Sequence, residues 1–379
     1  SSLLGQSDVR FRVAFGSDAS VVDDGFAFDD FSIFPFPPFD PEIVGLSQPA
    51  QGFGCFGNNE TLVLDVTNSG IDSLDFSVDS LVVTVNIAGA NTGSYVVSLT
   101  SGKLGPNQVQ GISIPGVDLA ALGTSTLDFD ISFVGDADTT NNTLSLSLVT
   151  QPLVDTYPYL EDFESGEGGW LSRGAASSWA FGTPNKETIQ GAGSGVNAWV
   201  TGGLDSTFYN EDENSAVLSP CFDMTNAPLG AFVGLKVWWE SESGFDGAVL
   251  QSSVDSGATW QNVGDFGDPN NWFNNDDISS TPGGSLVGWS GRFSTFSSNG
   301  SGGWLQASHP LDSGLIGQPD VRFRIAFASD GSVQDDGFAF DDFAIGLPPT
   351  VDLGADSASF CIGDSLDAGL GDVTYSWST

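Results

Sequence analysis

The chain has 379 residues, of which 49 are acidic and 9 basic, so its formal charge is −40 at pH 7. This balance excludes nucleic acid as a partner and argues against anionic membrane surfaces, because both repel a strongly acidic protein. Aromatic residues make up 12% of the chain, which argues against disorder. No apolar run approaches the roughly 20 residues of a membrane-spanning helix, so we expect no membrane insertion.

The residue usage predicts an all-β protein. Gly, Ser, Thr, Asn and Asp are plentiful, whereas Lys and Glu are scarce. Turn formers therefore outnumber helix formers, and short apolar strands recur along the whole length. The chain is long enough for two or three domains.

A long internal repeat joins the two ends of the sequence. Residues 3–34 align with residues 315–346 at a constant offset of 312, with 24 identities in 32 positions. One type of module is therefore used at least twice, and the chain between the copies is one period. We expect residues 1–37 to be the C-terminal strands of a preceding jelly-roll module, and the sequence to be a window of a longer repetitive protein.

The repeat contains two strands joined by turn residues. Apolar side chains alternate through residues 321–327 and again from Phe338, but the alternation changes phase at Asp341-Asp342. One extra residue in a strand, a β-bulge, produces such a change and pushes one of the two aspartates to the buried side. A buried carboxylate needs a cation or several donors, and the candidates are Arg322, Arg324 or a metal ion.

Residues 38–152 have the pattern of an immunoglobulin-like sandwich. Seven short alternating strands are separated by turn sequences in little more than a hundred residues. Proline-rich linkers are expected at residues 35–38 and 151–158. The expected strands are residues 62–66, 74–78, 81–87, 95–99, 112–114, 127–133 and 144–148.

Residues 153–347 are predicted to form a jelly roll of two antiparallel sheets. Aromatic-rich strands are expected at residues 235–240 and 247–253, and no helical periodicity interrupts them. The first and last strands of such a fold usually lie side by side. Residues 348–379, after a second proline pair, begin a further sandwich domain.

The expected pairing of the first and last jelly-roll strands predicts a metal site, because it brings carboxylates of both strands together. Asp162, Glu164, Asp341 and Asp342 would hold a calcium-type ion, with Asp205 from a nearby loop as a further ligand. Such an ion would stabilise the module as a structural cofactor. The alternative is an acidic seam neutralised by arginine.

Cysteine and histidine usage argues against zinc and against nucleophilic catalysis. Cys55, Cys221 and Cys361 fall in three different expected domains, and His309 is the single histidine. An odd number of cysteines cannot form a closed set of internal disulfides, so a partner outside the window is one possibility. Most paired carboxylates sit in turn-like contexts, and we predict that the chain is not an enzyme.

Two further motifs concern loops of the jelly roll. Residues 253–260 match the Asp box hairpin, in which the aspartate caps backbone N–H groups and the tryptophan packs beneath the turn. Trp272, Trp289 and Trp304 lie in Gly/Asn/Ser-rich segments. They would either stack on sugar rings or plug the ends of the sandwich.

The motifs P-Y-L-E-D-F-E-x-G-x-x-G-W and D-D-G-F-A-F-D-D-F-A-I resemble the MAM-like jelly rolls of secreted Bacteroidetes proteins. Residues 54–70 are similar to their adhesion-type immunoglobulin-like domains, and residues 353–369 to their PKD-like repeats. Together they resemble the giant SprB-like gliding-motility adhesins of the type IX secretion system. The resemblance implies a secreted filament attached to the outer membrane, with neighbouring modules and an extracellular surface or glycan as partners.

The resemblance also implies particular residues. It carries the MAM metal site to Asp162, Glu164 and Asp341 or Asp342, although the disulfide cysteines of eukaryotic MAM domains are absent here. It implies that Cys361 pairs with a cysteine near the far end of its own domain. Bacteroidetes O-glycosylation would act on Asp-Ser/Thr motifs, which place it at Ser73, Ser80, Thr139, Ser206, Ser357 and Ser365.

Two other functions remain open at this point. The chain could be a carbohydrate-binding module array appended to a secreted hydrolase or protease. It could also be a self-assembling filament subunit whose partner is another copy of itself.

Overall fold

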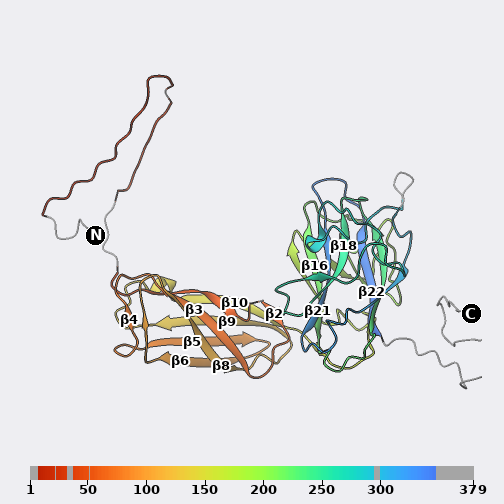
Figure 1. Ribbon diagram of the computed structural model, residues 1–379, viewed down its shortest axis with the longest axis horizontal. Coiled ribbons are helices and arrows are strands. Elements are labelled where there is room, and N and C mark those ends of the chain that lie inside the picture. Colours follow the sequence, from red (N-terminus) through yellow and green to blue (C-terminus); the bar gives the residue numbers. More distant parts are fainter. Residues whose placement is uncertain (1–6, 22, 32–36, 51, 294–298, 347–379) are drawn as a thin grey trace, which may run out of the picture.

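Twenty-two strands and two short 3-10 turns make up the secondary structure, in a computed structural model that describes residues 7–21, 23–31, 37–50, 52–293 and 299–346. These residues contain no α-helix, and none of them forms a helix suited to crossing a bilayer. The all-β prediction is confirmed. The strands gather in two sandwiches that follow one another along the long axis of the molecule (Figure 1).

The first sandwich has an immunoglobulin-like arrangement of two main sheets. One sheet has the order β1-β3-β8 and the other the order β2-β10-β9-β5-β6, while β4 and β7 form a separate pair. Alternating residues point inward, so Leu62, Leu64 and Val66 of β3 are fully buried. The bounds are β1 Pro41–Gln48, β2 Phe53–Gly54, β3 Glu60–Asn68, β4 Leu74–Asp75, β5 Leu81–Gly89, β6 Gly93–Leu99, β7 Lys103–Leu104, β8 Val109–Val117, β9 Gly123–Ser132 and β10 Thr143–Thr150.

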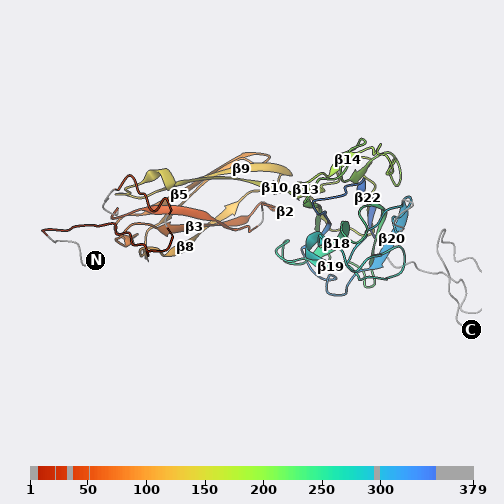
Figure 2. The ribbon, with the colours of Figure 1, turned by 90° about the horizontal axis from the view of Figure 1, so that it is seen from above.

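The second sandwich is the predicted jelly-roll type of fold, with two sheets face to face (Figure 2). One sheet has the order β11-β16-β21-β18-β19 with β13 on β16, and the other has β14-β15-β22-β17-β20 with β12 on β22. The bounds are β11 Leu153–Val154, β12 Tyr159–Glu161, β13 Leu171–Ala175, β14 Ala180–Gly182, β15 Ala198–Val200, β16 Asn214–Phe222, β17 Phe232–Glu240, β18 Gly247–Ser253, β19 Gln261–Asn262, β20 Leu305–Pro310, β21 Val321–Ala328 and β22 Gly337–Gly346.

The second copy of the repeat supplies the central strand of each sheet. β21 lies between β16 and β18, and β22 lies between β15 and β17 in the opposite sheet. Their phenylalanines meet in the middle of the core, where Phe323 and Phe343 have ring centroids 5.6 Å apart. Burial of each such ring contributes roughly 1.5–3 kcal/mol. This explains why the alternation of the repeat is so regular.

The first copy of the repeat behaves differently although its sequence is nearly the same. Its described residues form no strand, and Figure 1 shows them as an extended segment apart from both sandwiches. The phenylalanines that match buried core residues are 55–68% exposed, namely Phe11, Phe15, Phe26, Phe28 and Phe31. Strand formation therefore depends on neighbouring strands and not on the local sequence alone.

The segment predicted as a linker at residues 151–158 is a structured joint. β10 ends at Thr150, and β11 begins at Leu153, so two residues separate the sandwiches. β11 pairs with β16 at Leu153↔Cys221, which ties the linker to the second sandwich. The further domain expected at residues 348–379 lies outside the described residues.

Candidate functional site

The predicted pairing of the first and last jelly-roll strands is present. β12 pairs with β22 in antiparallel register, with Glu161 opposite Phe343. The predicted β-bulge is also present, because the β17–β22 register shifts between Gly234 and Lys236, opposite Ala344 and Asp341. Asp342 accordingly has a positive φ of 50°, and Asp341 is fully buried. The phase change at Asp341-Asp342 therefore predicted the buried carboxylate correctly.

Backbone donors and one lysine satisfy these two aspartates. The Asp341 carboxylate accepts hydrogen bonds from the backbone N–H of Ser194 at 2.8 Å and of Asp342 at 2.7 Å. Lys236 Nζ lies 2.8 Å from Asp342 Oδ2. Burial raises the pKa of Asp341 to about 6, against the opposing effect of its hydrogen bonds and of Lys236.

Neither arginine of the repeat neutralises this site, contrary to the sequence-based alternative. Arg322 pairs with Asp320 at 3.0 Å, and Arg324 lies over the ring of Trp260, 4.4 Å from its centroid. Both arginines lie on β21, in the sheet opposite β22. The lysine was missed because it lies on β17, far away in sequence, and no local pattern connects it with β22.

Glu164 accepts hydrogen bonds from the loop that also contains Ser194, the donor to Asp341. Its Oε1 accepts the backbone N–H groups of Val196 and Asn197, both at 2.8 Å. A Cβ at Gly195, where φ is +56°, would lie 2.3 Å from the Glu164 carboxyl carbon. Asp162 caps the turn below by accepting the N–H of Glu164 at 3.1 Å. Residues 191–197, which we call the clasp loop, thus lie between the carboxylates of β22 and Glu164.

The predicted ligand set is therefore not gathered around one point. The geometry of three carboxylate oxygens within 4.8 Å of one another is met, among the described residues, by Glu242, Asp246 and Asp330 instead. Asp205 is exposed in its loop. Its negative charge opposes the lowering of the Lys186 pKa by burial. With Lys236 on Asp342 and N–H donors on Asp341 and Glu164, the predicted site does not fit a calcium ion in this arrangement.

The cluster of Glu242, Asp246 and Asp330 lies where β17 and β21 end and β18 begins. Asp246 is fully buried and accepts the Tyr209 hydroxyl at 2.7 Å and the Asp330 N–H at 2.8 Å. Burial, with a smaller contribution from the charges of Asp330 and Glu242, raises its pKa to about 7 against the opposing effect of these hydrogen bonds. The Glu242 atom Oε2 is buried and has no hydrogen-bond partner. The D-x-S-V-x-D-D-G turn of the repeat provides Asp330, but no local pattern of the sequence connects it with Glu242 or Asp246.

The tryptophans proposed as sugar platforms are mostly core residues. Trp272 and Trp289 are 2% and 0% exposed, and their indole N–H groups donate to the carbonyls of Val263 and Asn271. A sugar ring cannot stack on an enclosed ring, so this hypothesis is wrong for both residues. Trp304 is half-buried and packs edge-on against Trp238 at 6.0 Å.

The Asp box forms as its motif predicts. Asp255 accepts the backbone N–H of Thr259 at 2.8 Å, together with the hydroxyls of Thr259 and Ser253. These hydrogen bonds, chiefly the Thr259 hydroxyl, lower the pKa of Asp255 to about 2. The Trp260 indole N–H donates to the Gly257 carbonyl at 3.0 Å, which closes the hairpin. The motif is a structural staple.

A hollow of about 500 Å³, lined by polar and apolar side chains, lies along β18, β19 and β20. Gln261, Asn262, Thr259, His309 and Asp312 contribute polar groups to its lining, and no Phe, Tyr or Trp ring lines it. His309 Nε2 lies 3.0 Å from Asp268 Oδ2, which fixes the imidazole. The hollow offers hydrogen-bonding groups without an aromatic platform.

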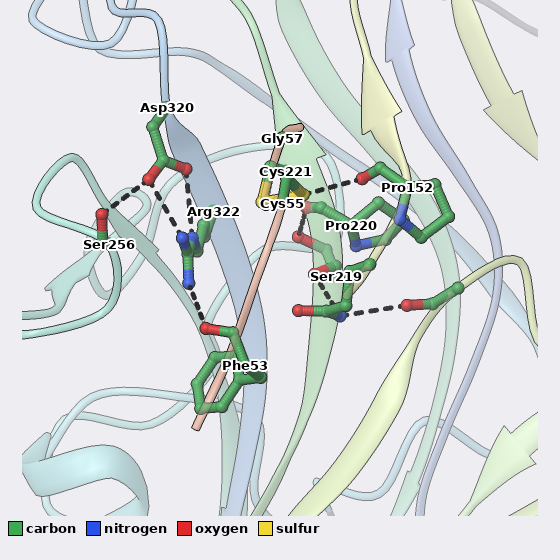
Figure 3. The surroundings of a disulfide bond; sticks show 12 residues. Phe53, Cys55, Gly57, Pro152, Ser219, Pro220, Cys221, Ser256, Asp320 and Arg322 are labelled. Atoms are coloured by element: carbon green, nitrogen blue, oxygen red, sulfur yellow. Dashed lines mark hydrogen bonds and ion pairs between the residues drawn. A yellow bond between two sulfur atoms is a disulfide. The ribbon is translucent and has the colours of Figure 1, made fainter. Parts of the chain in front are cut away.

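A disulfide between the sandwiches is the main feature that sequence reasoning did not find. Cys55, directly after β2, is bonded to Cys221 of β16, with Cα atoms 6.0 Å apart (Figure 3). β16 has a bulge immediately before the cysteine, since its register with β21 shifts between Leu218 and Cys221. Ser219 fills the gap there by accepting the Phe323 N–H with its hydroxyl at 2.9 Å. The sequence showed three cysteines in three domains but not which two would meet.

Polar contacts close the joint around this disulfide. Arg322, held by Asp320, donates to the Phe53 carbonyl of the first sandwich at 3.3 Å (Figure 3). The Gln151 side chain, which is buried, donates to the carbonyls of Gly169 and Ser219, both at 3.0 Å. Each sandwich therefore contacts the other through both side chains and backbone.

Four of the predicted glycosylation positions lie within the described residues. Ser73, Thr139 and Ser206 are exposed, and Ser80 is half-buried. Ser357 and Ser365 lie outside the described residues. Modification at these positions stays a prediction.

The sequence matches no protein-family model and no curated protein. Its fold is similar to the K1 cleaved adhesin domain of Lys-gingipain from Porphyromonas gingivalis W83, with 14% identity, a TM-score of 0.30, and 51% of this chain and 99% of that one covered. It is similar to SGBP-B from a complex xyloglucan utilization locus in Bacteroides uniformis, with 12% identity, a TM-score of 0.26, and coverages of 81% and 72%.

A third similar structure comes from carbohydrate-binding modules of the β-sandwich superfamily. It has 11% identity and a TM-score of 0.26, and it covers 80% of this chain and 97% of that one. At such identities and TM-scores, the three likenesses say nothing about activity or binding partner.

Proposed function

We propose that the chain is a repeat segment of a large secreted cell-surface adhesin, in which jelly rolls and immunoglobulin-like sandwiches alternate as a structural stalk. The repeat carries this proposal. Its second copy supplies the two central strands of a jelly roll, so residues 9–31 have the sequence to do the same in another jelly roll. A module with a period of 312 residues and a structured joint to its neighbour suits an extended array.

Labelling of intact cells tests this proposal. Antibodies raised against residues 37–346 should label the outside of unpermeabilised cells of the source organism, and external protease should remove the label. A label that appears only after permeabilisation would contradict a surface adhesin. Loss of adhesion or of gliding in a deletion strain, with normal growth, would then separate the two roles. We propose in addition that the protein is exported by the type IX system and is attached at the outer membrane.

Calcium remains part of the proposed stalk as a prediction. An ion that binds only the folded jelly roll raises its melting temperature by mass action. We expect a higher melting temperature in millimolar calcium than in chelator. If the ion replaces Lys236 beside Asp341 and Asp342, Asp341→Asn should abolish that rise. If the ion binds instead at the cluster of Glu242, Asp246 and Asp330, Asp246→Asn should abolish it. An unchanged melting temperature in the unmutated chain would discard the metal.

Glycan binding is the second candidate function, and the hollow along β18–β20, with its hydrogen-bonding groups, is the observation that favours it. A chain that binds glycans there should lose binding when Gln261 and Asn262 are both replaced by alanine. Gln306, exposed on β20 but outside the lining, provides a matched Gln306→Ala control. If the chain bound no glycan on an array, glycan binding would be rejected and the structural stalk would remain as the proposed function.

A further inference from the structure

The two sandwiches are linked by two covalent routes. The first is the backbone through Gln151 and Pro152, which separate β10 from β11. The second is the disulfide Cys55–Cys221, whose partners are 166 positions apart in the sequence. The linker lies beside the disulfide, since Cys221 donates its N–H to the Pro152 carbonyl at 3.1 Å and the Cys55 sulfur lies 2.9 Å from the same oxygen (Figure 3).

The positions of the cysteines make the second route much shorter than the first. Cys55 follows β2, so only β1 and β2 precede it in the first sandwich. Cys221 is the penultimate residue of β16, so β17–β22 follow it in the second sandwich. A covalent path from Pro41 to Gly346 therefore reaches Cys221 directly from Cys55 and leaves residues 56–220 outside.

We propose that the disulfide transmits mechanical tension from one sandwich to the other, so that tension along the chain bypasses residues 56–220. A stretched molecule carries force along its shortest covalent path. Noncovalent contacts at the joint, such as the hydrogen bond from Arg322 to the Phe53 carbonyl, can yield under load, whereas the S–S bond holds. The use of this bypass rests on the proposed stalk function, because only a stalk is pulled from both ends.

The bypass shields the whole core of the first sandwich. Every buried residue of that core, from Leu62 to Leu148, lies between the two cysteines. Force that enters at β1 can strip β1 from β3 and β2 from β10, but it then passes to β16 and stretches no further part of the first sandwich. The second sandwich is loaded only from Cys221 onwards, which includes the central strands β21 and β22.

Single-molecule force spectroscopy on the full chain, with handles at both termini, tests this inference. The oxidised chain should reach a full extension shorter than that of the Cys55→Ser/Cys221→Ser variant. The difference should be about 560 Å, since an extended residue spans roughly 3.4 Å and the loop covers 166 positions. Cys361→Ser serves as the control and should extend like the unmutated chain.

Equal full extensions of the oxidised chain and the double variant would overturn the bypass. So would an unfolding step in the oxidised chain that releases residues of the first-sandwich core. This test remains valid even if the double variant misfolds, because the full extension of a chain does not depend on whether its domains had folded. Reductant added to the unmutated chain should also increase its full extension to that of the double variant. Failure of the antibody to label intact cells would reject the proposed surface adhesin but not the bypass. Equal full extensions would reject the bypass but not the surface adhesin.

Discussion

At the scale of single residues, buried carboxylates decide how this protein responds to pH. Folding raises the pKa of Asp246 to about 7 and those of Asp341 and Glu240 to about 6, in each case chiefly through burial. An acid with a raised pKa binds its proton more tightly in the folded state than in the unfolded state. Stability therefore falls as pH rises from about 4 through 7, which is the reverse of acid denaturation.

Asp246→Asn should remove most of this effect at its site. Asparagine resembles the neutral acid, and Tyr209 keeps a second acceptor in the Val333 carbonyl at 3.2 Å. The shift corresponds to at most roughly 4 kcal/mol, and we expect a gain of about 1–2 kcal/mol at pH 8 after screening by water. Urea denaturation at pH 5 and pH 8 measures it. A variant less stable than the unmutated chain at both values would contradict the argument.

Gly195 in the clasp loop should tolerate no side chain. Gly195→Ala combines a strained φ of +56° with a Cβ 2.3 Å from the Glu164 carboxyl, so we expect a loss of about 2–3 kcal/mol. Gly191→Ala is the matched control, since its φ is +66° and nothing lies within 4 Å of the added Cβ. Thermal unfolding of both variants separates backbone strain from the clash. Equal losses would show that Glu164 moves aside freely.

At the scale of elements, the two copies of the repeat allow an experiment in which the sequence is nearly the same and the environment changes. Phe340 of β22 is fully buried, whereas its counterpart Phe28 is 62% exposed. Phe340→Ala should therefore destabilise the second sandwich by about 3–5 kcal/mol, and Phe28→Ala should leave it unchanged. Unfolding followed by tryptophan fluorescence reports the second sandwich. A loss in Phe28→Ala would mean that residues 9–31 pack where the structure leaves them exposed.

The same elements show what could be predicted from the sequence. Alternation located the strands around Leu62, Leu235 and Val249, and the phase change located the bulge at Asp341-Asp342. These are local properties of the chain. Lys236 beside Asp342, Asp246 beside Asp330 and Cys55 beside Cys221 were not predicted, because each pair meets only after sheets and domains are assembled.

At the scale of the whole molecule, the formal charge of −40 at pH 7 opposes the compact state. Of the ion pairs among the described residues, Lys236–Asp342 and Arg292–Asp335 have both side chains less than 30% exposed, so positive charge offsets only a small part of the repulsion. Dissolved salt screens charges beyond a Debye length of about 10 Å at 0.1 M. The folded chain should therefore gain stability from salt.

We expect the melting temperature to rise between 10 mM and 500 mM NaCl, by several degrees and most steeply at the low end, where the Debye length changes fastest. Sodium and tetramethylammonium chloride should act alike if screening is the cause, since neither cation coordinates carboxylates strongly. A rise with calcium that exceeds the rise with either salt at equal ionic strength would identify specific binding in addition. A melting temperature that falls with added salt would mean that the attraction within the half-buried ion pairs outweighs the repulsion among surface charges.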